Sequence, residues 1–326
     1  MILPYIKKET MSNFIGHQKQ IYFLAHNLKT NNLAHAYLFS GPEKIGKFTL
    51  ALKLAEAVFC ETTPRELMRN CGVCRNCLQV VSLSHPSIFV LDVDKTLVSR
   101  KENKKDIPIE DFRELKRILS LAPEEGRKRV VIINRADAMN TAAASSFLKL
   151  LEEPGSEVLF ILITENEKSL LPTVVSRVQV LKFSVLADEE IRKMISETTE
   201  DKKKIERMVI LSSGRPGRVV VFRDNPEILE KEEKFYRGVQ TVLARKFLPD
   251  IFHFSEKASK NPEYIRKTTE YVLKNLRAKL LAGKIGDNPL ILLRKIKRIG
   301  KIHDYLETTN LNPRLALDAL LMEAIN

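Results

Sequence analysis

The stretch AYLFSGPEKIGKF occupies residues 36–48 and decides the fold of the first half of the chain. AYLFS reads as an apolar strand, GPEKIGK as a glycine-rich turn, and the helical pattern TLALKLAEAVF follows at 49–59. In a phosphate-binding loop of this kind, backbone amides at the helix N-terminus cradle phosphates and the lysine reaches the outer phosphates. The candidate phosphate-binding residues are therefore Gly41, Gly46 and Lys47, and the predicted fold class is an α/β P-loop NTPase.

Four more apolar runs continue this pattern. Each is nearly continuous in hydrophobicity rather than alternating, which is typical of parallel strands covered by helices on both faces. Ligands bind such sheets at the carboxyl ends of the strands. The first half of the chain should therefore be one layered α/β domain. The four runs are SIFVLDV (87–93), RVVIIN (129–134), VLFILIT (158–164) and VQVLKF (178–183).

The second half of the chain has a different pattern. Beyond Leu186 the strand signal disappears, and segments of helical period separated by Gly and Pro take over. GRPGR at 214–218 interrupts a small helical unit, and the region after about Phe247 reads as a separate helical bundle. The sequence thus predicts three domains, at 1–184, 185–245 and 246–326.

The phosphate loop lacks groups that hydrolysis needs. A Ser or Thr should follow the lysine to hold magnesium, but Phe48 stands there, and Thr49 is turned about 100° around the helix. Phosphoryl transfer also needs an acidic pair after a buried strand, for the metal and the attacking water. Asn134 and Arg135 occupy those positions. We therefore expect no ATP hydrolysis by this chain.

The residues that would contact phosphate are still present in the loop. Lys47 and the two loop glycines therefore leave open whether ATP or ADP binds without being hydrolysed. Asp137 and Glu153 are the remaining acidic residues nearby in the sequence. We interpret both as solvent-exposed surface residues or helix caps.

All four cysteines fall in one short stretch, as Cys60, Cys71, Cys74 and Cys77. Two interlocking C-x-x-C steps place three thiolates on one tight turn, and Cys60, at the end of the preceding apolar helix, can complete a tetrahedral Zn²⁺ site. Four protein ligands leave no open coordination position, so the zinc would be structural. A redox C-x-x-C pair is the alternative, but it would use only two of the four thiols.

Composition limits the class of protein. The chain has 326 residues with a formal net charge of +13, which favours a polyanionic partner. It contains no apolar run long enough to span a membrane, and the opening MILPYIKKETM is too short and too quickly charged for a signal peptide. We therefore expect a cytoplasmic protein without a membrane partner.

Several of these stretches, taken together and in order, resemble one family, the AAA+ clamp-loader subunits of bacterial DNA polymerase III. The cysteine cluster combined with the other elements in this order is more specific than the phosphate loop, which many ATPases share. The resemblance rests on HAYLFSGP (35–42), the four-cysteine insertion, RVVIINRADAMNTAAASSFLKLLEEP (129–154), SRV (176–178) and NPRLALDALLM (312–322).

This resemblance implies a RecA-like AAA+ core, a small helical lid and a helical collar through which five subunits assemble. The partners it implies are the gamma or tau and delta subunits of the loader and, through the complex, the sliding clamp and primed DNA. In that assembly the chain is similar to the stator, whose own nucleotide site is dispensable.

The resemblance also implies a catalytic role in trans. Ser176 and Arg177 match a motif whose arginine contacts ATP bound on the neighbouring subunit, and Val178 replaces the usual cysteine. A guanidinium can contact the terminal phosphate and neutralise the charge that develops in transfer. The alternative is an arginine paired with a local carboxylate. The resemblance also identifies positions that act as nucleotide sensors in related ATPases, Thr164 for the first sensor and Arg215 and Arg218 for the second. We interpret these residues as remnants of a nucleotide site or as structural contacts.

Two other functions remain as alternatives. One is an active P-loop ATPase, such as the motor subunit of the same loader, which would require Ser or Thr at 48 and acids at 134 and 135. The other is a zinc-containing module that binds DNA directly, since residues 245–326 hold 16 Lys plus Arg against 9 Asp plus Glu, 16 − 9 = +7. The densest basic stretch, LLRKIKRIGKI (292–302), has no interleaved aromatic residue and the apolar spacing of a packed helix.

Overall fold

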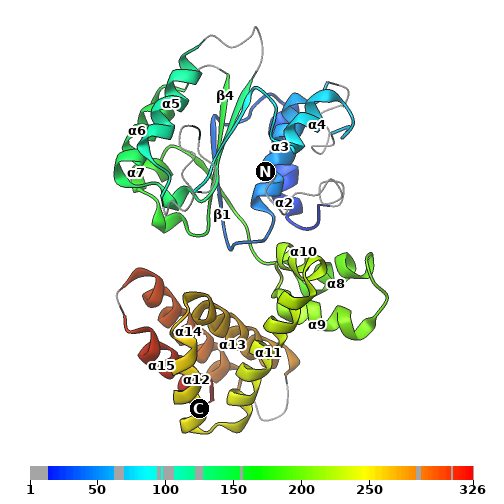
Figure 1. Cartoon of the computed structure of the whole chain (residues 1–326), viewed down its shortest axis with the longest axis vertical. Coiled ribbons are helices and arrows are strands. Elements are labelled where there is room, and N and C mark those ends of the chain that lie inside the picture. The colour runs from blue at the N-terminus through cyan, green and yellow to red at the C-terminus, as the bar shows by residue number, and fades with distance from the viewer. Residues whose placement is uncertain are drawn as a thin grey trace. The chain divides into compact units, whose positions relative to one another are not determined.

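Figure 1 shows the computed structural model of the chain. It describes residues 14–61, 70–93, 97, 106–121, 128–154, 157–283, 288–309 and 311–325, without the side chains of residues 307 and 308. The first ten residues, which carry no readable motif, and part of the cysteine insertion lie outside this range. The chain divides into two compact units: Met1–Thr198 with Gly214–Val220, and Thr199–Ser213 with Val221–Asn326. The three-domain division stays a prediction.

The first unit contains a five-stranded sheet in the order β2-β3-β4-β1-β5. All neighbouring strands are parallel, so their carboxyl ends meet at one edge, where Ser40 pairs with both Thr164 and Lys182. Every predicted strand is present, because continuous apolar runs are what a sheet buried on both faces requires. The strands are β1 Ala36–Ser40, β2 Ile88–Leu91, β3 Arg129–Ile133, β4 Val158–Thr164 and β5 Gln179–Lys182.

Helices cover both faces of this sheet (Figure 1). Each face buries its own apolar cluster, one that includes Leu50 and Leu54, and one that includes Phe112, Phe147 and Phe160. On the first face lie α2 (Gln18–Lys29), α3 (Lys47–Phe59) and α4 (Arg75–Val81), and on the second α5 (Ile109–Ser120), α6 (Thr141–Glu152) and α7 (Pro172–Val175). The shorter elements η2 (Ala136–Ala138) and η3 (Glu167–Ser169) follow β3 and β4, and α8 (Asp188–Ser196) follows β5.

The second unit is helical throughout its described residues. Four of its helices begin at an Asn-Pro step, because proline fits the first helical turn. In three of them the asparagine side chain also accepts a hydrogen bond from a backbone amide of that turn, at Asn261, Asn288 and Asn312. The helices are α9 (Lys202–Ser212), α11 (Pro226–Arg245), α12 (Leu248–Ala258), α13 (Pro262–Ala282), α14 (Pro289–Thr308) and α15 (Pro313–Ile325), while α10 (Pro216–Asp224) crosses the division between the units.

The predicted fold class is therefore confirmed: a parallel α/β sheet with helices on both faces, followed by helices alone. Among the helices of the described ranges, none combines the length and the apolar character needed to cross a membrane.

Candidate functional site

The predicted phosphate loop connects β1 to α3 at the carboxyl edge of the sheet. Both of its glycines have positive φ, 151° at Gly41 and 101° at Gly46, a conformation that glycine adopts without strain. A Cβ at Gly41 would also lie 2.2 Å from the carbonyl oxygen of Phe183, so no other residue fits there. Both glycines therefore stand at positions where the backbone of this loop favours glycine, while phosphate binding stays a prediction.

Lys47, the first residue of α3, folds back onto this loop. Its ammonium group donates hydrogen bonds to the carbonyl oxygens of Gly41 and, at 2.6 Å, of Pro42, and the residue is only 6% exposed. Burial lowers the pKa of Lys47 to about 8, although the negative charge of Glu165 acts in the opposite direction. In this structure the group that should meet phosphate is thus bonded to the loop's own carbonyls.

The start of α10 packs against the same loop. The amide of Gly217 donates to the carbonyl oxygen of Lys44 at 2.8 Å, and the guanidinium of Arg215 lies 3.7 Å from the carboxylate of Glu43. Arg215 and Arg218, the second-sensor positions of the sequence, are both buried. Arg215 is therefore beside the phosphate loop, where its charge helps to lower the pKa of Lys47.

Phe48, the residue after the lysine, has apolar surroundings. The side chain of Phe48 packs against the buried cluster on the α3 side of the sheet. Because this half-buried ring packs against the core, the position offers an apolar contact where a magnesium-binding loop would offer a hydroxyl.

The end of β3 holds a polar network in place of an acidic pair. The side-chain amide of Asn134 donates to Asp92 at 2.7 Å, and the guanidinium of Arg135 makes two contacts with the same carboxylate, at 2.7 and 2.6 Å. Asp92 is buried at the end of the neighbouring strand β2. Sequence analysis missed Asp92, although its place after the apolar run SIFVL was an available signal.

Thr164, the first-sensor position at the end of β4, is also engaged. Its hydroxyl donates to the carboxylate of Asp137 at 2.9 Å and accepts from the amide of Asn166 at 3.2 Å. Asp137 is therefore a hydrogen-bond partner of β4, a more specific role than the surface solvation or capping expected for it. Glu153, the other acidic residue, is exposed just after α6, as expected.

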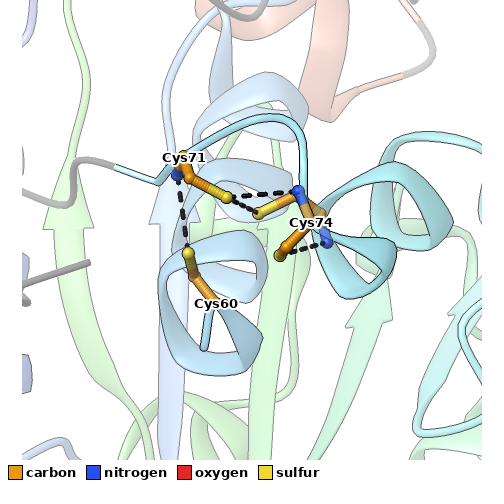
Figure 2. Close-up of side chains that lie close together, drawn as sticks. Cys60, Cys71 and Cys74 are labelled. Atoms are coloured by element: carbon orange, nitrogen blue, oxygen red, sulfur yellow. Dashed lines mark hydrogen bonds between the residues drawn. The ribbon is translucent and has the colours of Figure 1, made fainter. Parts of the chain in front are cut away.

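The four cysteines come together between the end of α3 and the first turn of α4. Figure 2 shows three of them, Cys60, Cys71 and Cys74. All four sulfur atoms lie within 4.8 Å of one another, and those of Cys71 and Cys77 are 3.9 Å apart. Four thiolates at the corners of a tetrahedron around Zn²⁺, with Zn–S near 2.3 Å, would be separated by about 3.8 Å. These residues therefore form a group that could hold a metal ion.

Backbone amides already point at these sulfur atoms. The amide of Cys71 donates to the sulfur of Cys60 at 3.5 Å, and the amide of Cys74 donates to the sulfur of Cys71 at 3.2 Å (Figure 2). The amide of Cys77 donates to the sulfur of Cys74 at 3.4 Å. Burial raises the pKa of the Cys77 thiol, because a buried thiolate without a cation is unfavourable. The turn is thus shaped for bound thiolates, and a cation would supply the missing charge.

Arg177 follows α7, on the side of the sheet that α6 covers. Its guanidinium donates to the carboxylate of Glu152 at 2.9 Å and to the carbonyl oxygen of Thr173 at 3.0 Å. Ser176 contacts the same carbonyl and lies 3.3 Å from the guanidinium. The local carboxylate partner considered as an alternative therefore exists, but Arg177 remains exposed at the surface. Sequence analysis did not identify Glu152.

The densest basic stretch of the sequence lies within α14 in the second unit. Leu292 and Ile299 of this stretch are buried, and Arg298 contacts Glu323 of α15 at 3.2 Å. The expected packed helix is confirmed, with its remaining basic residues on the outer faces.

Comparisons with known proteins agree on one family. The family described as DNA polymerase III, delta subunit, matches residues 16–187. The DNA polymerase III subunit delta' of Bacillus subtilis is 30% identical over 223 residues, covering 68% of this chain and 64% of that protein. The subunit delta' of Pseudomonas aeruginosa is 35% identical over 144 residues, covering 44% and 41%. The chain thus aligns with less than two thirds of the length of either relative.

Tau and gamma-related proteins are also similar to this chain. The DNA polymerase III subunit tau of Escherichia coli is 31% identical over 190 residues, covering 57% of this chain and 27% of that protein. Among solved structures, a DNA polymerase III gamma subunit-related protein from Thermotoga maritima is 17% identical with a TM-score of 0.40, covering 94% of this chain and all of that one. Because residues 16–187 are more than half of the 326 residues, the chain belongs to the DNA polymerase III delta subunit family, and it resembles the delta-prime members of that family.

Proposed function

We propose that this chain is a delta-prime subunit that acts as the non-hydrolysing stator of the DNA polymerase III clamp loader. The observation that carries the proposal is the network at the end of β3, where Asn134 and Arg135 both bind Asp92. Phosphoryl transfer needs a metal ion and an oriented water at that place. A guanidinium paired with a buried carboxylate offers neither a metal ligand nor a base for water.

The state of the phosphate loop supports the same proposal. Lys47 is hydrogen-bonded to the loop carbonyls, and Phe48 packs against the buried core. Any nucleotide would have to displace the lysine from these carbonyls before its phosphates could bind. Nucleotide binding, if it occurs, would therefore be without turnover, and the chain by itself is not an enzyme. It would be a non-catalytic subunit of a DNA-directed DNA polymerase complex.

The catalytic contribution proposed for the chain is made in trans by Arg177. This guanidinium is at the surface, on a segment that the core holds in place through Val174 of α7. An arginine supplied to a neighbouring site stabilises the charge of the transferring phosphoryl group, and its planar fork can contact two oxygens together. Ser176 would support this segment through its bond to Thr173.

Structural zinc is proposed for Cys60, Cys71, Cys74 and Cys77. The sulfur separations and the amide-to-sulfur bonds support this assignment over a redox pair, since all four thiols take part in one group. Bound zinc would neutralise the thiolates and tie α3 to α4. In the same proposal, residues 1–184, 185–245 and 246–326 are the core, the lid and the collar that joins the subunits.

The partners are the gamma or tau and delta subunits, and through them the sliding clamp and primed DNA, in the cytoplasm. The names of the matching proteins, delta', tau and gamma/tau, support this set of partners. The test is to mix the purified chain with the gamma or tau and delta subunits of its own organism and measure the mass of the product by light scattering. A stable complex that contains this chain is expected, and an unassociated chain at micromolar concentration would contradict the proposal.

A direct DNA-binding role is the second candidate. The excess of basic residues after residue 245 favours it, but the packing of α14 against α15 uses part of that stretch for structure. Duplex or primed DNA should therefore leave the isolated chain unbound at moderate salt, where nonspecific phosphate contacts are weakened.

A further inference from the structure

Arg177 has a defined carboxylate partner, Glu152, which comes from a different element. Glu152 is the last residue of α6, and its carboxylate lies 2.9 Å from the guanidinium of Arg177. The two residues are 25 positions apart in the sequence, so their pairing depends on how α6 and α7 pack.

The place of Glu152 in its helix is unfavourable for a carboxylate. The carboxyl end of a helix carries partial negative charge, which favours cations there and disfavours anions. Lys149 in the last turn satisfies that preference, whereas Glu152 opposes it. The guanidinium of Arg177 offsets part of this unfavourable interaction.

The two elements that carry the pair share one core. Phe147, Leu150 and Leu151 of α6 and Val174 of α7 belong to the same buried cluster. The backbone on both sides is therefore fixed, and the carboxylate and the guanidinium meet at the surface above that cluster, with 51% and 38% of their side chains exposed. An incoming subunit can reach the guanidinium in this position.

We propose that Glu152 is a positioning residue for Arg177, holding its guanidinium in the orientation that it presents to the neighbouring subunit. This inference rests on the proposed function of Arg177 in trans. An unrestrained arginine side chain samples many rotamers. Fixing it in one rotamer on assembly costs conformational entropy, and this cost is smaller if the side chain is already restrained. Glu152 restrains one terminal nitrogen, and Thr173 with Ser176 restrains the other.

The geometry of the pair allows release as well as orientation. Of the five N–H donors of a guanidinium, these contacts engage three among the described residues, which leaves donors for phosphate oxygens. An exposed ion pair is also weak, so the phosphate of a neighbouring ATP can share or replace the carboxylate. Glu152 thus orients Arg177 without sequestering it.

The test uses the loader reconstituted with this chain carrying Glu152→Ala, Glu152→Gln or Arg177→Ala. The difference in kcat between wild type and Arg177→Ala defines the part of ATP hydrolysis that depends on Arg177. Glu152→Ala should lower that part about two- to fivefold, as the loss of one weak restraint would. The KM for ATP should stay unchanged, since assembly and nucleotide binding are not affected. Glu152→Gln, which has the same size and keeps an accepting oxygen, should retain more activity than Glu152→Ala.

Two controls separate this role from others. Glu153→Ala removes the neighbouring exposed carboxylate and should leave kcat at the wild-type value. In the Arg177→Ala background, Glu152→Ala should cause no further loss, because a residue that acts only through Arg177 has nothing left to position.

The possible outcomes are distinct. If Arg177→Ala has no effect, the proposed function in trans fails. If Arg177→Ala lowers kcat while both Glu152 variants match wild type or exceed it, only the positioning role is overturned. A further loss from Glu152→Ala in the Arg177→Ala background would also overturn it.

Discussion

The guanidinium of Arg135 lies 2.6 Å from the carboxylate of Asp92, which is buried at the end of the adjacent strand β2. In a protein that hydrolyses ATP, the position of Arg135 would hold an acidic residue. Here the side chain at that position carries a positive charge. The acidic group is present one strand away, but the guanidinium and the amide of Asn134 occupy it. The pair therefore has a structural role, and in the proposed function it stands in place of a catalytic acidic pair.

The first prediction is that Arg135→Ala destabilises the chain. Asp92 would keep its bond from Asn134 but lose a charged partner while remaining buried, which typically costs about 1–3 kcal/mol in the free energy of unfolding. Chemical denaturation of the purified chain measures this. Arg117→Ala, which breaks a solvent-exposed pair with Glu114, is the matched control and should cause no measurable loss. Equal stability of Arg135→Ala and wild type would show that the buried pair is unimportant.

The strands and the cysteine site could be predicted from the sequence because each depends on local pattern. A buried parallel strand needs a continuous apolar run, and C-x-x-C spacing fixes thiols on one turn. The partners of Arg135 and Arg177 could not be predicted in the same way. Asp92 and Glu152 are 43 and 25 residues from their arginines, and only the order of the strands and the packing of α6 on α7 bring them together.

The second prediction is that the isolated chain does not hydrolyse ATP above the background of the preparation. In the proposed stator, Phe48, Asn134 and Arg135 stand in place of the metal-binding and water-orienting groups that turnover needs. A phosphate-release assay at saturating ATP and magnesium measures this, with Lys47→Ala as the comparison. A robust rate that Lys47→Ala abolishes would establish the motor-subunit alternative in place of the stator.

The third prediction concerns pH and Lys47. Burial lowers its pKa in the folded chain from the ordinary 10.5 to about 8. Between these two values the unfolded chain binds more protons at this group, so its contribution to the free energy of unfolding rises with pH. The stability of wild type relative to Lys47→Met should therefore increase from about pH 7.5 to about pH 9.5, because methionine does not titrate. Denaturation of both proteins at both pH values measures the change, and a decrease would contradict the buried placement of Lys47.

The fourth prediction is that freshly purified, reduced protein contains about one zinc per chain. Cys74→Ser should lose the metal and speed amide exchange in α4, with little effect on α13 in the other unit. Val73→Ser is the matched control, since Val73 lies between the cysteines, is exposed and has no thiol. Elemental analysis that finds well under half an equivalent in wild type would exclude a structural zinc site.

The central claim is that this chain contributes to catalysis only through Arg177, on a neighbouring subunit. The most direct measurement is clamp-stimulated and DNA-stimulated ATP hydrolysis, together with clamp loading, by loaders reconstituted with wild type, Arg177→Ala, Arg177→Lys or the control Arg117→Ala. An arginine finger is worth on the order of a thousandfold at its own site. Because this is one site among several in the ring, the whole complex should lose less. Arg177→Ala should assemble normally and lower both rates, Arg177→Lys should rescue poorly because an ammonium lacks the planar fork, and Arg117→Ala should match wild type. An Arg177→Ala loader that assembles normally and loads clamps at the wild-type rate would contradict the account.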